Sequence, residues 1–172
     1  LLSYSRVQRD TSAFTNVDMQ QVFDQVLYNL QITIEDTCST ITHDELPSII
    51  ANEGQMVQLL QNLVGNSLKF RQSRPLIVHV GVERRSDDWV FYVQDNGIGI
   101  QPEYRERIFT LFQRLHTRDQ YSGTGIGLAI CRKIVTEHGG EIWVESQPGE
   151  GTTFYFSIPV KATKGLSSHA QY

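Results

Sequence analysis

The residues with the clearest chemical potential form a stripe of amide and ammonium side chains on one predicted helix. The segment from Glu53 to Arg71 has apolar residues at helical spacing, and Asn62, Asn66 and Lys69 follow at i, i+4 and i+7. Asparagine competes for backbone hydrogen bonds, so this stripe costs helix stability. Amide oxygens can bind a hard cation such as Mg²⁺, and a lysine can bind phosphate. The stripe indicates either a solvated helix surface or a site for metal-bound phosphate.

Glycines form three clusters, each beside a predicted helix or strand. The clusters are Gly97 with Gly99, then Gly123, Gly125 and Gly127, then Gly149 with Gly151. Glycine lets backbone amides approach a ligand closely. The second cluster ends where a helix is predicted to begin, and free N–H groups with the positive helix dipole favour a polyphosphate there. The third cluster alone indicates only a tight turn.

Two common nucleotide-binding motifs are absent from these clusters. The chain has no G-x-x-x-x-G-K-[ST] segment, which excludes a P-loop. Leu128 stands where G-x-G-x-x-G would place its third glycine after Gly123 and Gly125, so a dinucleotide site of the Rossmann type is not expected.

The elements that must position these groups can be predicted from apolar spacing and from turn residues. A helix is expected from Met19 to about Asp36, capped by Asp18 with Gln21 in a capping box. Further strands are expected at 37–42, 47–51, 76–85, 89–94, 141–146 and 152–160, and further helices at 53–71, from 102 and at 127–138. Hairpin-linked strands flanked by helices indicate an α+β fold: a two-layer α/β sandwich with a mixed, mostly antiparallel sheet and helices on one face.

Composition narrows the class of protein. The 172 residues are 40% hydrophobic, enough for one globular domain, and the net charge of -4 gives no reason to expect binding to nucleic acid or direct membrane contact. No apolar run approaches the roughly 18 to 20 residues of a membrane span. Cys38 and Cys131 have no neighbouring cysteine, so we predict buried thiols in a reducing, cytoplasmic compartment.

Five motifs, taken together, resemble those of one protein family. They are Asn62–Phe70, Asp95–Ile100, Ile108–Phe112, Gly123–Leu128 and Gly149–Thr152. They are similar to the asparagine box, the glycine boxes and the phenylalanine box of sensor histidine kinases, in the same order and spacing over roughly Asp18 to Pro159. The chain thus resembles the ATP-binding catalytic domain of a bacterial sensor kinase of the GHKL superfamily, similar to phytochrome-like sensors. This resemblance implies a Bergerat-type ATP-binding fold.

The resemblance also implies roles for individual residues. Asn66 and Asn62 would bind Mg²⁺ between the phosphates, and Lys69 would contact a phosphate oxygen. The Asp95 carboxylate would accept a hydrogen bond from the adenine amino group, and Thr152 would bind adenine through water. The other implied ATP-binding residues are Gly97, Gly99 and Ile100 beside the base, and Arg118, Gly123, Gly125, Gly127 and Leu128 near the phosphates. Residues 113–122 would form a lid over ATP.

The phospho-accepting histidine that the family requires is not expected in this chain. His43 is followed by an acidic residue, as in an acceptor motif, but Pro47 breaks any helix there. The resemblance therefore implies two protein partners: a His-bearing dimerisation domain of the same kinase, and a response regulator receiver domain. Residues 1–16 would be the end of a dimerisation helix and a linker, 17–160 the catalytic domain, and 161–172 a disordered tail.

Alternatives within the same superfamily remain open at this point. Members that hydrolyse ATP have a glutamate at the position of Asn62, and an amide cannot act as a general base. We therefore expect ATP binding with little hydrolysis, which disfavours an ATP-driven machine of the gyrase or MutL class. A protein serine kinase of the same fold, or a nucleotide sensor without catalysis, would carry the same ligand residues.

Overall fold

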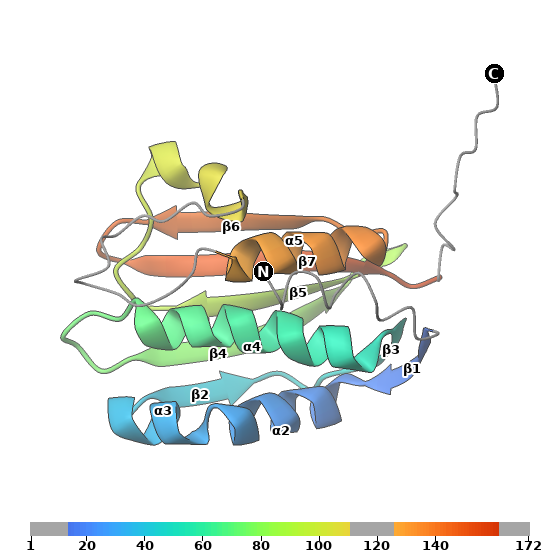
Figure 1. Ribbon diagram of the computed structural model, residues 1–172, viewed down its shortest axis with the longest axis horizontal. Helices are drawn as coiled ribbons and strands as arrows, with labels where there is room; N and C mark the ends of the chain where they lie inside the picture. The colour runs from blue at the N-terminus through green and yellow to red at the C-terminus, as the bar shows by residue number, and fades with distance from the viewer. Residues whose placement is uncertain (1–13, 111–125, 162–172) are drawn as a thin grey trace.

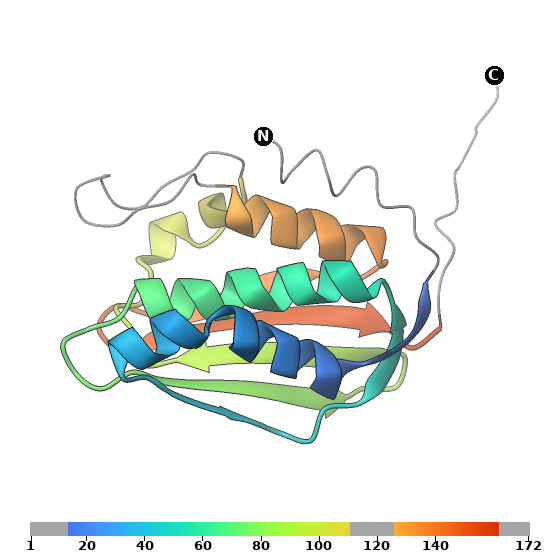
Figure 2. The same ribbon diagram turned by 60° about the horizontal axis from the view of Figure 1, so that its bottom comes forward.

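The computed structural model describes residues 14–110 and 126–161, which form two layers (Figures 1 and 2). The helices are α2 (Met19–Asn29), α3 (Gln31–Thr37), α4 (Glu53–Lys69) and α5 (Gly127–Glu137), with 3-10 turns η1 (Pro102–Tyr104) and η2 (Arg107–Phe109). The strands are β1 (Thr15–Asp18), β2 (Thr40–His43), β3 (Ser48–Ala51), β4 (Ile77–Arg84), β5 (Asp88–Asp95), β6 (Ile142–Gln147) and β7 (Gly151–Pro159). Within these described ranges, no helix is long and apolar enough to cross a bilayer.

The main sheet has five strands in the order β2-β4-β5-β7-β6. Only β2 and β4 are parallel; the other neighbours pair antiparallel, and β1 pairs with β3 in a separate ribbon. Figure 2 shows α2, α4 and α5 side by side over one face of the sheet. The predicted α+β sandwich with a mixed, mostly antiparallel sheet is confirmed.

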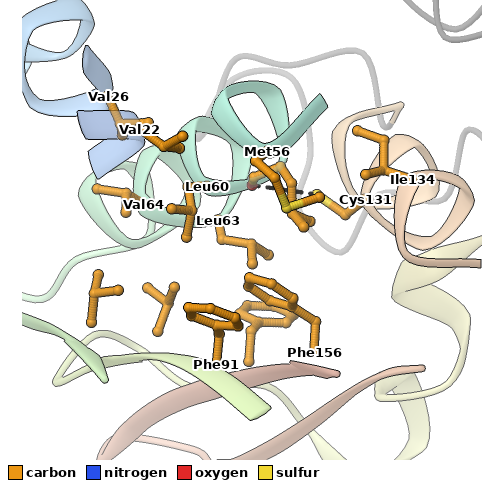
Figure 3. Packing of buried hydrophobic residues seen from close by; sticks show 14 of the residues in the cluster. Val22, Val26, Met56, Leu60, Leu63, Val64, Phe91, Cys131, Ile134 and Phe156 are labelled. Atoms are coloured by element: carbon orange, nitrogen blue, oxygen red, sulfur yellow. Dashed lines mark hydrogen bonds between the residues drawn. The ribbon is translucent and has the colours of Figure 1, made fainter. Parts of the chain in front are cut away.

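Helix α4 lies at the centre of the hydrophobic core (Figure 3). Leu60 and Leu63 point from α4 toward Phe91 and Phe156, whose stacked rings lie 5.1 Å apart on β5 and β7. Cys131 on α5 is fully buried, and this burial raises the pKa of its thiol to about 12. The apolar side of α4 packs between the other helices and the sheet. The polar residues on the opposite side of α4 therefore face in one fixed direction.

The predicted helix 19–36 is wrong in one respect, because the chain forms two helices that meet at Leu30. Asn29 ends α2, and its side chain donates to Gln61 of α4 at 2.9 Å. Asparagine is a weak helix former because its side chain competes for backbone hydrogen bonds, and this favours the end of α2 at Asn29. The predicted capping box also differs: Asp18 does cap α2, but its carboxylate accepts from Gln20 N at 2.9 Å. Within the described residues, no bond from Gln21 completes the box.

The N-terminal linker and one cysteine also differ from expectation. Thr15 and Asn16, assigned to the linker, belong to β1 and pair with β3. The pairing is favourable because it places Val17 in the core. Cys38 is exposed rather than buried, because it ends α3, a helix without buried residues; its backbone is left-handed, with φ of 49°. The expected dimerisation helix (1–7) and the expected tail beyond 161 lie outside the described residues.

His138 joins β1, α4 and α5 at one end of the helical layer. It is buried, and its Nδ1–H donates to the carbonyl of Ile134 at 2.8 Å while Nε2 accepts from Asn52 N at 3.1 Å. The Phe14 ring stacks on the imidazole at 4.6 Å. A backbone N–H can only donate, so the neutral ring is the form that fits, and burial accordingly lowers the pKa of His138.

We expect His138 to make stability depend on pH. The unfolded chain binds a proton near pH 6.5, whereas the folded state resists protonation until a lower pH. The contribution of His138 is therefore complete above about pH 6.5 and declines on acidification toward the lowered folded-state pKa. In His138→Gln, whose amide oxygen can accept from Asn52 N, the unfolding free energy should fall less between about pH 7 and 5 in urea titrations. If the unfolding free energy depends on pH equally in wild type and His138→Gln, this role is contradicted.

Candidate functional site

The side chain of Asp95, at the end of β5, is the best-connected polar group of the site. Its Oδ2 accepts from Ser67 Oγ of α4 at 2.7 Å. Its Oδ1 accepts from Gly97 N at 2.9 Å and from Thr152 N of β7 at 3.3 Å. Burial raises the pKa of Asp95, and these three hydrogen bonds oppose that shift because they favour the ionised form. Asp95 is thus a carboxylate fixed in place.

Ser67 was missed by the sequence analysis, although it is the residue that joins α4 to Asp95. It is buried, on the side of α4 that carries Leu60, Leu63 and Leu68. A hydroxyl on the apolar side of an amphipathic helix needs a partner, and this signal in the sequence could have drawn attention to it.

The stripe of Asn62, Asn66 and Lys69 lies on the partly exposed side of α4, as predicted. Asn62 Nδ2 lies 3.4 Å from the carbonyl of Gly127, so the stripe adjoins the beginning of α5. Among residues 14–110 and 126–161, no side chain caps this end of α5. The N–H groups of its first turn, which includes Leu128, are therefore suited to an anionic ligand.

Two glycines after Asp95 are required by packing within the protein. A Cβ on Gly97 would lie 2.5 Å from the carbonyl oxygen of Phe70 at the end of α4. Gly99 has φ of +75°, and a Cβ there would lie 2.1 Å from the Gln147 carbonyl oxygen. The resemblance suggested that these glycines let the chain pass a bound base; the structure adds that larger residues would collide with neighbouring backbone.

A pair of buried hydroxyl groups lies next to Asp95. Thr152 stands opposite Asp95 in the β5–β7 ladder, and its Oγ1 is 2.9 Å from Ser146 Oγ of β6. Ser146 Oγ also accepts from Ile100 N at 2.8 Å, which holds the end of the loop that follows Asp95. Thr152 and Ile100 thus lie on either side of Ser146, a second residue that the sequence analysis did not single out.

Several predicted site residues lie outside the described part of the chain. These are Gly123, Gly125 and Arg118, with the expected lid at 113–122. Of the phenylalanine box, Phe109 is described: it is buried, with its ring edge-on to Phe154 at 6.1 Å.

An open hollow of about 380 Å³ lies at the ends of β5, β6 and β7. Asp95 and Thr152 line it, but so do Gln94, Glu145 and Thr153, which alternate with the core-facing residues of their strands. None of its lining residues comes from α4 or α5. The hollow therefore adjoins the site of Asp95 on the sheet side and does not by itself hold the groups of the helical stripe.

Three kinds of group that are able to bind a ligand lie in this region: the Asp95 carboxylate, the amide and ammonium side chains of α4, and the first-turn N–H groups of α5, which no described side chain caps. A carboxylate accepts hydrogen bonds from an amino group, and the other two groups suit phosphate and a cation. No group of three or more His, Cys, Asp or Glu residues that could hold a metal occurs in the ranges 14–110 and 126–161. A cation bound here would take its oxygens from amides and phosphate.

Comparison with known proteins agrees with this arrangement. Residues 51–162 match the family model "Histidine kinase-, DNA gyrase B-, and HSP90-like ATPase". The chain is 52% identical over 160 residues to cyanobacterial phytochrome A of Nostoc sp. (strain PCC 7120 / SAG 25.82 / UTEX 2576). The matched segment covers 93% of this chain but only 21% of that protein. The chain therefore spans about one fifth of the length of this relative.

Solved structures show the same fold. The catalytic domain of histidine kinase ThkA has a TM-score of 0.74 and 29% identity, over 87% of this chain and 97% of that one. ThkA in complex with response regulator protein TrrA gives a TM-score of 0.71 at 26% identity, over 88% of this chain and 43% of that one. With the site geometry above, these similarities show that the chain belongs to the family of histidine kinase-, DNA gyrase B- and HSP90-like ATPases, as a histidine kinase ATPase domain.

Proposed function

We propose that this domain binds Mg-ATP and transfers its γ-phosphate to a histidine on a separate dimerisation domain of the same sensor kinase. The observation that carries the proposal is the hydrogen bond of 2.7 Å between Ser67 and Asp95. It ties the acid that would select the base to the helix that carries Asn62, Asn66 and Lys69. The group proposed for the base is thereby linked directly to the helix that carries the groups proposed for the cation and the phosphates.

In this proposal each end of ATP has its own binding groups. Asp95 accepts a hydrogen bond from the adenine amino group, with Thr152 beside it. Lys69 and the first-turn N–H groups of α5, at Gly127 and Leu128, bind phosphate oxygens. For the residues outside the described ranges, Arg118, Gly123 and Gly125, phosphate binding stays a prediction.

The amide groups of Asn66 and Asn62 fit a magnesium ion. Both lie on the partly exposed side of α4, and Asn62 Nδ2 is engaged by the Gly127 carbonyl, which leaves Oδ1 for a cation. Mg²⁺, when bound, would neutralise charge on the phosphates. The chain itself contributes positioning, since phosphoryl transfer depends chiefly on alignment and electrostatic stabilisation. Asn62 cannot take a proton from water, so hydrolysis is disfavoured relative to transfer.

The phosphate acceptor belongs to another domain in this proposal. The histidines described are His43 and His79 in strands, and His138 in the core. His79 is held between Thr42 Oγ1 at 2.7 Å and Asp44 Oδ1 at 3.0 Å. None lies on an exposed helix that could approach its own ATP. The ThkA complex with a response regulator supports a receiver domain as the next partner. We propose a cytoplasmic location, with neither nucleic acid nor the membrane as a direct partner.

Reconstitution tests this function. The full 172-residue chain, mixed with a His-bearing dimerisation domain of a related phytochrome-like kinase and γ-labelled ATP, should label the histidine of that domain. The label should be acid-labile and absent when that histidine is replaced by glutamine. The chain alone should release little phosphate. Labelling of a serine instead would favour a serine kinase, binding without transfer would favour a nucleotide sensor, and rapid ATP hydrolysis would contradict the proposal.

Asp95→Asn should weaken ATP binding by about a hundredfold, because a charged acceptor for the adenine amino group is lost. The amide oxygen can still accept from Gly97 N and Thr152 N, so the unfolding free energy should change by no more than about 1 kcal/mol. Calorimetric titration and urea denaturation measure the two effects. Wild-type affinity should also decline on acidification toward the raised pKa of Asp95, a dependence that the variant should lack. Retained affinity in the variant would refute the adenine role.

Asn66→Ala should remove most of the magnesium dependence of ATP binding and lower phosphotransfer by about a hundredfold, since an amide ligand is lost. Gln61→Ala is a matched control, because Gln61 lies on the same helix but contacts Asn29 of α2 at 2.9 Å. Titration with ATP at varied magnesium concentration measures the magnesium dependence of binding for both variants, and only Asn66→Ala should lose it. If the control and Asn66→Ala behave alike, Asn66 is not a metal ligand.

A further inference from the structure

The segment between α4 and β4 contacts both loops beside Asp95 and Thr152. Gln72 Nε2 donates to the carbonyl of Gly97 at 2.6 Å and to that of Gly149 at 2.7 Å. The Arg74 guanidinium donates twice to the Asn96 carbonyl, at 3.1 and 2.9 Å, and also to the Gly149 carbonyl at 3.2 Å. It reaches the Glu150 carbonyl as well, at 3.1 Å.

These contacts cross between loops that are far apart in the sequence. Residues 96–99 directly follow Asp95, and residues 148–151 directly precede Thr152. One backbone bond joins the two loops, from Gly149 N to the Ile98 carbonyl at 2.8 Å. Another joins the first loop to the end of α4, from Ile98 N to the Phe70 carbonyl at 3.0 Å. The two side chains, Gln72 and Arg74, therefore complete a network that already spans three segments.

The chemistry of the network requires a donor of this kind. The carbonyl oxygens of residues 96, 97, 149 and 150 all lie within hydrogen-bonding distance of Gln72 or Arg74. Carbonyl dipoles that converge repel one another unless donors lie between them. Arginine offers several N–H donors and a positive charge in a fixed planar geometry, so it can satisfy several carbonyls at once.

We propose that Gln72 and Arg74 are positioning residues, which hold the two loops in the shape that receives the nucleotide base before the nucleotide binds. The inference rests on the proposed function, because it concerns the same ATP site. Both loops contain glycine, whose backbone loses the most conformational freedom on ordering. Without Gln72 and Arg74, nucleotide binding would have to order the loops. The free energy spent on this ordering would lower the affinity for the nucleotide.

The test uses Gln72→Ala, Arg74→Ala and the double variant in the full 172-residue chain. Each single substitution should raise the Kd for ATP about fivefold and the double about twentyfold, as expected when hydrogen bonds that order a loop are lost. The same factor should apply to ADP, because these loops lie by the base and not by the α4 stripe. Calorimetry should show a more unfavourable binding entropy. In the nucleotide-free protein, amide exchange at Ile98 and Gly149 should become faster.

Arg84→Ala is the matched control. Arg84 also donates to three backbone carbonyls, those of Arg85, Ser86 and Asp88, but it does so in the turn at the far end of β4. Its loss should leave the Kd for ATP and the exchange at Ile98 and Gly149 unchanged. Arg74→Gln, which keeps an amide donor, replaces Arg74→Ala should that variant fail to fold.

The outcomes separate this inference from the function on which it rests. If wild type binds ATP and the double variant binds equally well with unchanged exchange, the positioning role is overturned and the proposed function stands. If the Arg84→Ala control weakens binding as much as the double variant, the effect is a general loss of stability and the positioning role is also overturned. If wild type binds no adenine nucleotide, both proposals fail.

Discussion

The carboxylate of Asp95 accepts hydrogen bonds from α4, from the loop that follows β5, and from the first residues of β7. A buried charge of this kind is costly unless it is well hydrogen-bonded, and here neutral donors, a hydroxyl and two backbone N–H groups, supply that stabilisation. The three segments cannot shift independently without leaving the charge unsatisfied. The hydrogen bonds of this one side chain, together with the apolar packing of α4, therefore fix how the central helix and the sheet lie relative to one another at the site.

Much of this architecture could be predicted from the sequence, because it follows from periodic patterns. The apolar spacing of α4 predicted both the buried side with Leu60 and Leu63 and the stripe of Asn62, Asn66 and Lys69 opposite to it. Alternation and turn residues predicted the strands that bring Asp95 opposite Thr152. Since both sets of residues belong to or adjoin regular elements, local pattern was sufficient to assign them to those elements, whereas the pairing of β5 with β7 is a long-range contact that local pattern does not predict.

The remaining features depend on contacts that no local pattern records. Ser67 and Ser146 are single hydroxyls that bond to Asp95 and to Ile100, which lie 28 and 46 residues away in sequence. Gln72 and Arg74 bind backbone carbonyls, which every residue type has, so no motif marks their targets. The pairing of β1 with β3 is likewise a tertiary contact, and it overrides the loop preference of the polar residues in this segment.

The ribbon of β1 and β3 has a mechanical consequence for the domain. It leads directly into the N-terminal end of α4, and Phe14 stacks on His138 at the same end. Lys69 stands at the other end of this 17-residue helix, about 25 Å along its axis. The first described residue thus lies near one end of this helix, and Lys69 lies at the other end. A rigid-body rotation of the domain about Phe14 would therefore displace Lys69 farther than it displaces the groups at the N-terminal end of α4.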